Sequence, residues 1–245
     1  MHIASLAKSN TEILHSLGCA NEIVASTSYD AKLAPNSKTV GSYVDIDIAQ
    51  IISLRPGIAF TSTFLQEKYA QELFAGGIEV IHFDPLSVDD IMENILDAGL
   101  AVNCSDKAKK IVAGMKSEIA KIKESASNPI PNIYLEEWPR PPMASGNWVV
   151  QMLELAGARG ILRQGQRSRE VTLEELLEFN PEKIVLSWCG VGLNADPKIV
   201  KNRSGWNALG AVAQNKIFVV DDSYFNTPSQ NVARGIAEIA KILRG

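Results

Sequence analysis

Short apolar runs alternate with helical patterns along the whole chain, and this alternation limits the fold more than any other feature. Apolar runs of four to eight residues bounded by turn residues are typical of buried strands, whereas apolar residues at a period near 3.6 indicate helices. Strands that alternate with helices favour an α/β fold with a mostly parallel sheet. The predicted strands are residues 3–6, 23–26, 58–61, 80–83, 133–135, 184–187 and 217–220.

An internal repeat indicates two similar lobes. The segment DIDIAQIISLRPGIAF matches VTLEELLEFNPEKIVL at an offset of 125 residues, which aligns Pro56 with Pro181 and Asp47 with Thr172. Each copy reads as a polar helix cap, an apolar helical stripe, a proline and a β-branched strand. The alternative is that any α/β protein repeats this pattern by chance. Two lobes of like topology usually hold a ligand in the crevice at their strand ends.

Helical stripes mark the ends and the middle of the chain. Ser9 lies three residues before Glu12, a spacing that predicts a capping box for a helix ending at Gly18. A second stripe runs over residues 105–125, and a third begins at Val232 near the carboxyl terminus. We therefore predict two Rossmann-like α/β lobes with mostly parallel central sheets, residues 1–104 and 127–245, bridged by one long rigid helix over residues 105–126.

Composition and motifs exclude several classes of function. The chain has 245 residues, a formal net charge of -4 and no basic stripe, which argues against nucleic acid as a partner. No apolar run reaches the roughly 18 residues of a membrane span. The sequence holds no nucleophile elbow, phosphate-binding loop, dinucleotide fingerprint or zinc-protease motif. We expect no catalytic residues, no resident cofactor and no metal site.

The histidines and cysteines support the same expectation. His2, His15 and His82 form no ligand cluster, and a structural role is expected for all three. The three cysteines at positions 19, 104 and 189 are far apart and lack C-x-x-C spacing, so they predict neither a disulfide framework nor a zinc site. They are expected to be buried small apolar residues.

Aromatic side chains gather where predicted strands end. Large aromatic faces with a few polar groups suit a flat or bulky organic ligand, although any one of them taken singly is more typical of packing. The segment EEWPRPPMASGNWVV combines prolines with an expected helix cap at Asn147, so its backbone N–H groups are expected to face a polar ligand group. Arg169 is expected either to pair with a ligand carboxylate or phosphate or to lie on the surface. The predicted ligand-binding residues are Tyr29, Tyr43, Trp138, Ser145, Trp148, Arg169, Trp188, Tyr224 and Phe225.

Four segments carry a resemblance to a known family. SLAKSNTEILHSLG resembles the start S-L-x-P-S-x-T-E-I-L-x-x-L-G, with Lys8 in place of proline, and VGSYVDIDIAQIISLRPGIAF is similar to a V-G-x-Y/W segment followed by x-L-x-P-D, with Gly57 in place of Asp. GWNALGAVAQNKIFVVD looks like W-x-x-L-x-A-V-x-x-G-x-V-Y. The chain thus resembles the cobalamin and iron-siderophore binding proteins of ABC importers, the helical-backbone class. The stretch from Trp138 to Trp148, with SREVTLEELL after it, looks closest to a leaderless corrinoid-binding branch.

The resemblance implies a function and a partner. It implies two α/β lobes around one rigid helix, a ligand in a shallow cleft, and a docking role for Glu67 on an ABC permease. We expect a substrate-binding protein for a cobalamin-like corrinoid or a related metal chelate, with a ferric siderophore or haem as the nearest alternative ligand. A cytoplasmic chelatase-like enzyme of tetrapyrrole metabolism is the alternative of another class. The start MHIASLAKSN has no signal-peptide pattern, so the chain is expected in the cytoplasm, or outside it if a leader is removed.

Overall fold

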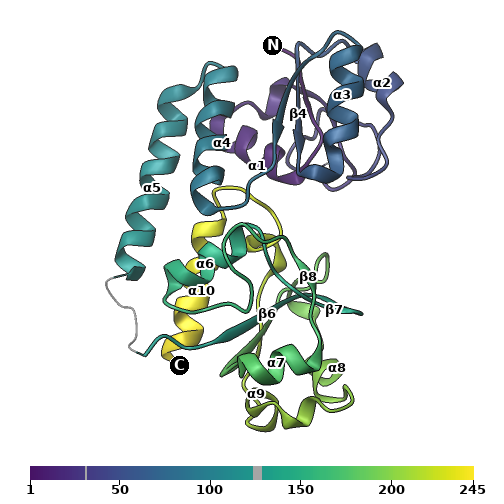
Figure 1. Ribbon diagram of the computed structural model, residues 1–245. Helices are drawn as coiled ribbons and strands as arrows, with labels where there is room; N and C mark the ends of the chain where they lie inside the picture. The colour runs from purple at the N-terminus through teal and green to yellow at the C-terminus, as the bar shows by residue number, and fades with distance from the viewer. Residues whose placement is uncertain (31, 124–128) are drawn as a thin grey trace. The chain divides into compact units, whose positions relative to one another are not determined.

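The computed structural model describes residues 1–30, 32–123 and 129–245, which form two compact units. The first unit comprises residues 1–85 and 91–113, and the second comprises residues 86–90 and 114–245. Each unit holds one five-stranded sheet with helices on both faces (Figure 1). The predicted α/β fold class is confirmed.

The sheet of the first unit is entirely parallel, in the order β3-β2-β1-β4-β5. Figure 1 shows α2 and α3 on one side of β4 and α1 on the other. Buried aliphatic side chains such as Leu6, Ile51 and Leu73 fill the space beneath α2 and α3. The elements are β1 Ile3–Ser5, α1 Lys8–Leu17, η1 Ala20–Glu22, β2 Ile23–Ser26, β3 Lys38–Thr39, α2 Ile48–Leu54, β4 Ile58–Ser62, η2 Phe64–Gln66, α3 Glu67–Ala75 and β5 Glu79–Phe83. The helices α4 Val88–Ala101 and α5 Ser105–Lys123 follow, and each includes residues of both units.

The sheet of the second unit has the order β10-β9-β6-β7-β8, in which β10, β9 and β6 are parallel and β7 and β8 are antiparallel to their neighbours. Its core includes Tyr134, Trp188 and Trp206. The elements are β6 Ile133–Pro139, β7 Pro142–Ala144, α6 Trp148–Ala156, β8 Arg169–Glu170, α7 Leu173–Phe179, β9 Lys183–Leu186, η3 Gly192–Asn194, α8 Pro197–Lys201, η4 Trp206–Ala208, α9 Gly210–Ala213, β10 Ile217–Val219, η5 Asp222–Tyr224 and α10 Val232–Arg244.

The internal repeat corresponds to real structural equivalence. Asp47 caps α2 by accepting from the Gln50 N–H, and Thr172 caps α7 by accepting from the Glu175 N–H. Both helices then end in a left-handed residue, Arg55 and Asn180, at the same offset of 125. The strands that follow, β4 and β9, each lie beside the first strand of their own sheet.

The two sheets differ in the connection between their first strand and the next strand in the chain. In the first unit, α1 crosses over to the parallel strand β2. In the second unit, a tight turn at Arg140 and Pro141 leads directly into β7, which is therefore antiparallel to β6. The two-residue strands β3 and β8 form the corresponding outer edges of the two sheets.

Two expectations about helix starts need correction. The predicted capping box at Ser9 is wrong, because α1 begins at Lys8 after Ala7 and has no side-chain cap. Ser9 is buried and its hydroxyl donates to the Ser62 hydroxyl at 3.5 Å. Asn147 does precede α6, but its side chain makes no capping bond. Gly18 ends α1 in the left-handed conformation, as predicted.

The predicted bridging segment overlaps α5, which the structure describes over Ser105–Lys123. Positions 124–126 lie outside the described residues. The boundary between the compact units falls inside this helix, after residue 113, and residues 86–90 belong to the second unit. The predicted lobe boundaries and the rigidity of the bridging helix stay predictions.

Candidate functional site

Exposed apolar side chains cluster at the carboxyl edge of the first sheet. Tyr29 follows β2, Val44 lies in the loop after β3, and Phe64 and Leu65 are the first two residues of η2, one residue after β4. Their side chains are between 50% and 67% exposed although each is large and apolar. We call these four residues the first apolar edge. Exposed apolar patches of this kind, next to polar loops, mark binding surfaces.

A buried glutamine fixes the loops that carry the first apolar edge. Gln66 donates from Nε2 to the carbonyl oxygens of Leu6 at 2.6 Å and Tyr43 at 2.8 Å, and its Oε1 accepts from the Ser62 N–H at 2.8 Å. Its side chain is fully buried, so these bonds form in a setting of low polarity, where they are strong. Three chain segments that follow three different strands are thereby held together.

Tyr43, a predicted ligand-binding residue, lies half-buried behind this edge. Its hydroxyl donates to the Ser62 carbonyl at 2.9 Å and lies 2.6 Å from the Thr63 hydroxyl. Burial raises the pKa of the Tyr43 phenol above its usual value. Tyr43 is therefore a neutral group at physiological pH, and its ring is positioned by hydrogen bonds rather than free to rotate.

Asp30 is a fully buried carboxyl group next to Tyr29. Its Oδ2 accepts from the Thr27 N–H at 3.2 Å and from the Thr27 hydroxyl at 2.6 Å, whereas its buried Oδ1 has no hydrogen-bond partner among the described residues. Burial raises its pKa from 3.8 to about 6, against the lowering effect of the two Thr27 bonds and of Lys8, while Glu12 adds to the rise. The ionised form is therefore costly in the folded state.

Asp30→Asn is expected to change how stability depends on pH. A folded pKa of about 6, above the unfolded value of 3.8, means that the folded protein binds more protons in this window, so stability falls as pH rises through it. Between pH 4 and pH 7 this group should destabilise the protein by about 2 kcal/mol. In the Asp30→Asn variant, the free energy of unfolding should not show this fall between pH 4 and pH 7, because the titrating carboxyl group is absent. Parallel pH profiles for the natural protein and the variant would contradict the assignment.

The carboxyl edge of the second sheet also carries exposed apolar side chains. Trp138, near the end of β6, is 44% exposed, and Leu193, in η3 after β9, is 68% exposed. The indole N–H of Trp138 donates to the Arg140 carbonyl at 3.1 Å, which holds the ring against its own turn. Tyr224, after β10, is half-buried. We call Trp138 and Leu193 the second apolar edge.

A buried carboxylate organises the sheet beneath the β6–β7 turn. Glu136 accepts two bonds from the Arg203 guanidinium, at 2.5 and 2.8 Å, one from the Tyr134 hydroxyl at 2.9 Å and one from the Trp188 indole N–H at 2.8 Å. The Arg203 guanidinium also stacks on the Trp206 ring, 4.4 Å from its centroid. Burial and the neighbouring carboxylate raise the pKa of Tyr134 well above its usual range. The charge of Glu136 is thus fully compensated.

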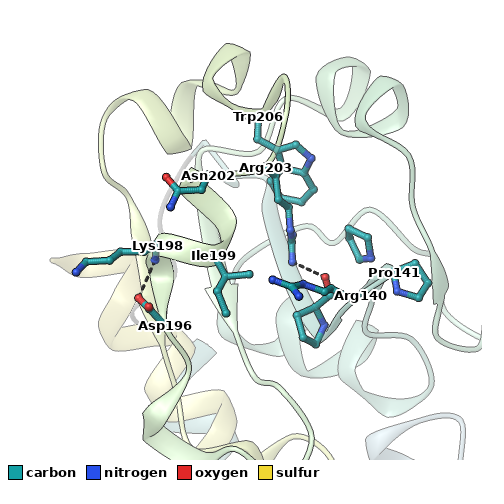
Figure 2. A pocket seen from close by; sticks show the side chains of 10 residues that line it. Arg140, Pro141, Asp196, Lys198, Ile199, Asn202, Arg203 and Trp206 are labelled. Atoms are coloured by element: carbon teal, nitrogen blue, oxygen red, sulfur yellow. Dashed lines mark hydrogen bonds between the residues drawn. The ribbon is translucent and has the colours of Figure 1, made fainter.

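A pocket of about 640 Å³ opens beside this cluster (Figure 2). Figure 2 shows Arg203 beneath Trp206, pointing to the turn, where it donates to the Pro139 carbonyl at 2.8 Å. The side chain of Lys198 extends away from the turn. The volume lies in the range of small-molecule sites. The pocket is lined by Pro139, Arg140, Pro141, Pro142, Asp196, Lys198, Ile199, Asn202, Arg203 and Trp206.

The loop before α6 uses its backbone N–H groups internally, contrary to the expectation that they face a ligand. The Gly146 N–H donates to the Ser168 hydroxyl at 3.0 Å, and the Asn147 N–H donates to the Gln166 carbonyl at 2.7 Å. The Ser168 hydroxyl in turn donates to Glu137 at 2.6 Å, and burial raises the pKa of that carboxyl. Ser145, a predicted site residue, is buried, and its hydroxyl has no partner among the described residues.

Three of the predicted site residues lie in the core of the second unit. Trp148, Trp188 and Phe225 are at most 6% exposed. The indole N–H of Trp148 donates to the Phe225 carbonyl at 2.7 Å, and that of Trp188 is bound by Glu136. What the structure shows for these side chains is packing and internal hydrogen bonding, and their contact with a ligand stays a prediction.

Arg169, a predicted ligand-binding residue, lies on the surface, and its contact with a ligand stays a prediction. It lies exposed in β8 and pairs with Glu175 at 2.8 Å, while its guanidinium also donates to the Glu170 carbonyl. Arg169 lowers the pKa of Glu175, with the Thr172 N–H contributing. The guanidinium is therefore engaged with the capping box of α7.

Several residues at the strand ends were not predicted from the sequence. Val44, Phe64, Leu65 and Leu193 are exposed apolar residues in loops, and Asp30 is a buried acid. One signal was available: Phe64 and Leu65 are consecutive apolar residues immediately after a strand end, where polar turn residues are usual. The others carry no distinguishing pattern.

The described residues offer no group of three or more His, Cys, Asp or Glu side chains that could hold a metal ion. Cys189 follows Trp188, and burial raises the pKa of its thiol to about 12, with Glu137 and Asp222 adding to the rise. A protonated thiol is a weak nucleophile.

Within residues 1–30, 32–123 and 129–245, no helix is long and apolar enough to cross a membrane.

Sequence and structure comparisons identify the family. The model of the periplasmic binding protein family matches residues 3–224. The chain therefore belongs to that family. An uncharacterized ABC transporter substrate-binding lipoprotein of Bacillus subtilis (strain 168) is 26% identical, over 98% of this chain and 78% of that protein. A vitamin B12-binding protein of Vibrio campbellii is 21% identical, over 98% and 88% of the two chains.

A solved structure shows the same fold. A possible iron-binding (periplasmic solute-binding) protein from Staphylococcus epidermidis superposes with a TM-score of 0.84 at 21% identity, covering 100% of this chain and 98% of that chain. The resemblance stated from the sequence motifs is thereby confirmed at the level of family and fold.

Proposed function

We propose that this protein is the substrate-binding component of an ABC importer and that it binds a corrinoid or a closely related metal chelate. The observation that carries the proposal is the exposed apolar surface at the carboxyl edge of each sheet, formed by Tyr29, Val44, Phe64 and Leu65 in one unit and by Trp138 and Leu193 in the other. Such surfaces suit a bulky ligand with a large apolar area. We also propose that it binds this ligand without transforming it.

The chemistry of the edges supports a corrinoid over the alternatives. Haem propionates and acidic siderophores carry negative charges that basic side chains would pair. The six residues of the two apolar edges are uncharged, and Arg203 is bound by Glu136, so the basic side chains next to the second edge are those of Arg140 and Lys198. A neutral macrocycle rimmed by amides fits such a surface better. The relative named as a vitamin B12-binding protein agrees with this choice.

A spectroscopic screen tests the ligand. Cobalamin, cobinamide, haem and a ferric trihydroxamate are titrated separately while tryptophan fluorescence and the visible spectrum of the ligand are recorded. We expect saturable quenching with cobalamin or cobinamide. If haem or the ferric siderophore bound more tightly than the corrinoids, that molecule would be the ligand in place of a corrinoid. Absence of binding by all four would overturn the proposed ligand class.

Trp138→Ala is expected to weaken binding of the ligand found in this screen by about 1 to 3 kcal/mol, because the substitution removes an exposed indole ring on which the ligand would stack. Phe74→Ala is the matched control, since Phe74 is also an exposed aromatic, 73% accessible, but lies at the far end of α3. Isothermal titration measures both affinities. Equal affinities for the two variants would move the site away from Trp138.

We propose an ABC permease as the partner, with Glu67 as a docking residue. Glu67 is exposed and is the first residue of α3. Glu67→Ala is expected to change the free energy of unfolding by no more than about 0.5 kcal/mol and to leave ligand affinity unchanged. Its association with the permease should weaken and depend less on salt.

The control for Glu67 is Glu79→Ala, because Glu79 is an exposed acid at the opposite, amino end of β5. Permease pull-down at two salt concentrations compares the variants. Equal association of both with the permease would argue against docking through Glu67.

We further propose that the protein acts outside the cytoplasmic membrane, where an importer collects its substrate. Cell fractionation with antibody detection tests this location.

A further inference from the structure

Two cysteines that are far apart in the sequence lie side by side in the first unit. The Sγ atoms of Cys19 and Cys104 are 3.7 Å apart, although 85 positions separate the residues. Cys19 is buried and Cys104 is partly exposed. A disulfide requires an S–S distance of about 2.0 Å, so a side-chain adjustment of under about 2 Å would join them. This pairing is not predicted by the spacing of the cysteines.

Helix ends hold both cysteines in place. Gly18 ends α1 in the left-handed conformation, after which the Cys19 N–H donates to the Leu14 carbonyl at 2.9 Å. The Cys104 N–H likewise donates to the Gly99 carbonyl at 2.6 Å, just after α4. Such closing bonds are typical of helix carboxyl ends and leave the backbone little freedom.

A second contact joins the end of α1 to the α4–α5 junction. The Lys107 ammonium, in the first turn of α5, donates to the Leu17 carbonyl at the end of α1 at 2.9 Å. The end of α1 and the α4–α5 junction are therefore in contact both through this bond and through the two thiols. A covalent link between the thiols would preserve an arrangement that already exists, rather than impose a new one.

We propose that Cys19 and Cys104 form a reversible disulfide that links α1 to the α4–α5 junction. The oxidant is an external disulfide, such as glutathione disulfide. The Cys104 thiolate attacks it, forming a mixed disulfide and releasing one thiol. Cys19 then loses its proton to solvent and attacks Sγ of Cys104, which releases the second thiol. Two protein thiols and one external disulfide thus become one protein disulfide and two external thiols.

The surroundings of the two thiols favour this order of events. Burial raises the pKa of Cys19 to about 12, and the neighbouring Cys104 contributes to the rise. Cys19 is therefore a poor first nucleophile, whereas Cys104 is the more exposed residue of the pair. Once Cys104 is in the mixed disulfide, the proximity of Cys19 makes the second step intramolecular.

Peptide mapping of the natural protein tests the proposal. The folded protein is incubated with glutathione disulfide, free thiols are blocked, and a non-reducing digest is examined by mass spectrometry. We expect a peptide pair joined through Cys19 and Cys104 that separates on reduction. We also expect the oxidised protein to have a Tm on the order of 5 °C higher, because the link closes a long loop in the unfolded chain.

Two variants serve as controls. Cys189→Ser keeps the pair and should behave as the natural protein does. Cys19→Ala should instead retain glutathione on Cys104 and show no rise in Tm. The proposal fails if the folded natural protein accumulates glutathione on Cys104 without forming the linked peptide, or if both thiols stay reduced while the same treatment oxidises an exposed model dithiol.

Discussion

Glu136→Ala is expected to lower the free energy of unfolding by about 3 to 5 kcal/mol, the range for breaking a buried ion pair by removing one partner. The Glu136 side chain is fully buried and that of Arg203 is 13% exposed, so the guanidinium would lose its carboxylate with little access to water. The Tyr134 hydroxyl and the Trp188 indole N–H would lose their acceptor as well. Urea denaturation measures the change.

The matched control is the exposed pair of the same unit. Arg169 and Glu175 are also 2.8 Å apart, but their side chains are 45% and 37% exposed. Arg169→Ala should therefore cost no more than about 1 kcal/mol. If both substitutions lower stability by a similar small amount, burial does not make Glu136 the organising residue of this sheet. Glu136→Gln, which keeps one acceptor, should fall between them.

Gly146→Ala is expected to destabilise the protein by about 3 kcal/mol through overpacking. A Cβ atom at this position would lie 2.4 Å from the Arg167 carbonyl carbon and from the Ser168 nitrogen, and 2.6 Å from the Gln166 carbonyl oxygen. All three atoms belong to the backbone and cannot move aside cheaply. The backbone movement needed to make room for the Cβ atom would also disturb the hydrogen bond between the Gly146 N–H and the Ser168 hydroxyl.

Gly114→Ala provides the opposite expectation for the same chemical change. Gly114 lies inside α5, and a Cβ there would meet no heavy atom within 4 Å. Alanine is the better helix former, so this variant should gain about 0.5 to 1 kcal/mol. Thermal unfolding of both variants compares the two sites. Equal effects of the same sign would contradict the close packing at Gly146.

Much of the fold is predictable from the sequence because its signals are local. Strand 23–26 and the caps at Asp47 and Thr172 depend on residues within one turn of each other, and the structure has them where the pattern indicates. The capping box at Ser9 failed because α1 begins one residue earlier, at Lys8, and the Ser9 hydroxyl inside the helix contacts Ser62, 53 positions away. The direction of β7 was likewise not predicted, since a short turn at Arg140 and Pro141 decides it.

The candidate site was predictable only in part, because burial depends on contacts far along the chain. Tyr29 and Trp138 are exposed at strand ends as the pattern indicates, whereas Trp188 has the same position in the sequence pattern but packs in the core. The difference lies in Glu136, which binds the Trp188 indole from 52 positions away. The Cys19–Cys104 contact is undetectable from the sequence for the same reason.

The outer strands β3 and β8 have a consequence for the behaviour of the protein in concentrated solution. Each is only two residues long and carries charge, Lys38 in one and Arg169 with Glu170 in the other, and all of these side chains are exposed. A foreign strand that approached either edge would find few free backbone groups and would have to desolvate a charge. Sheet extension into aggregates is thereby discouraged at the β3 edge of one sheet and at the β8 edge of the other.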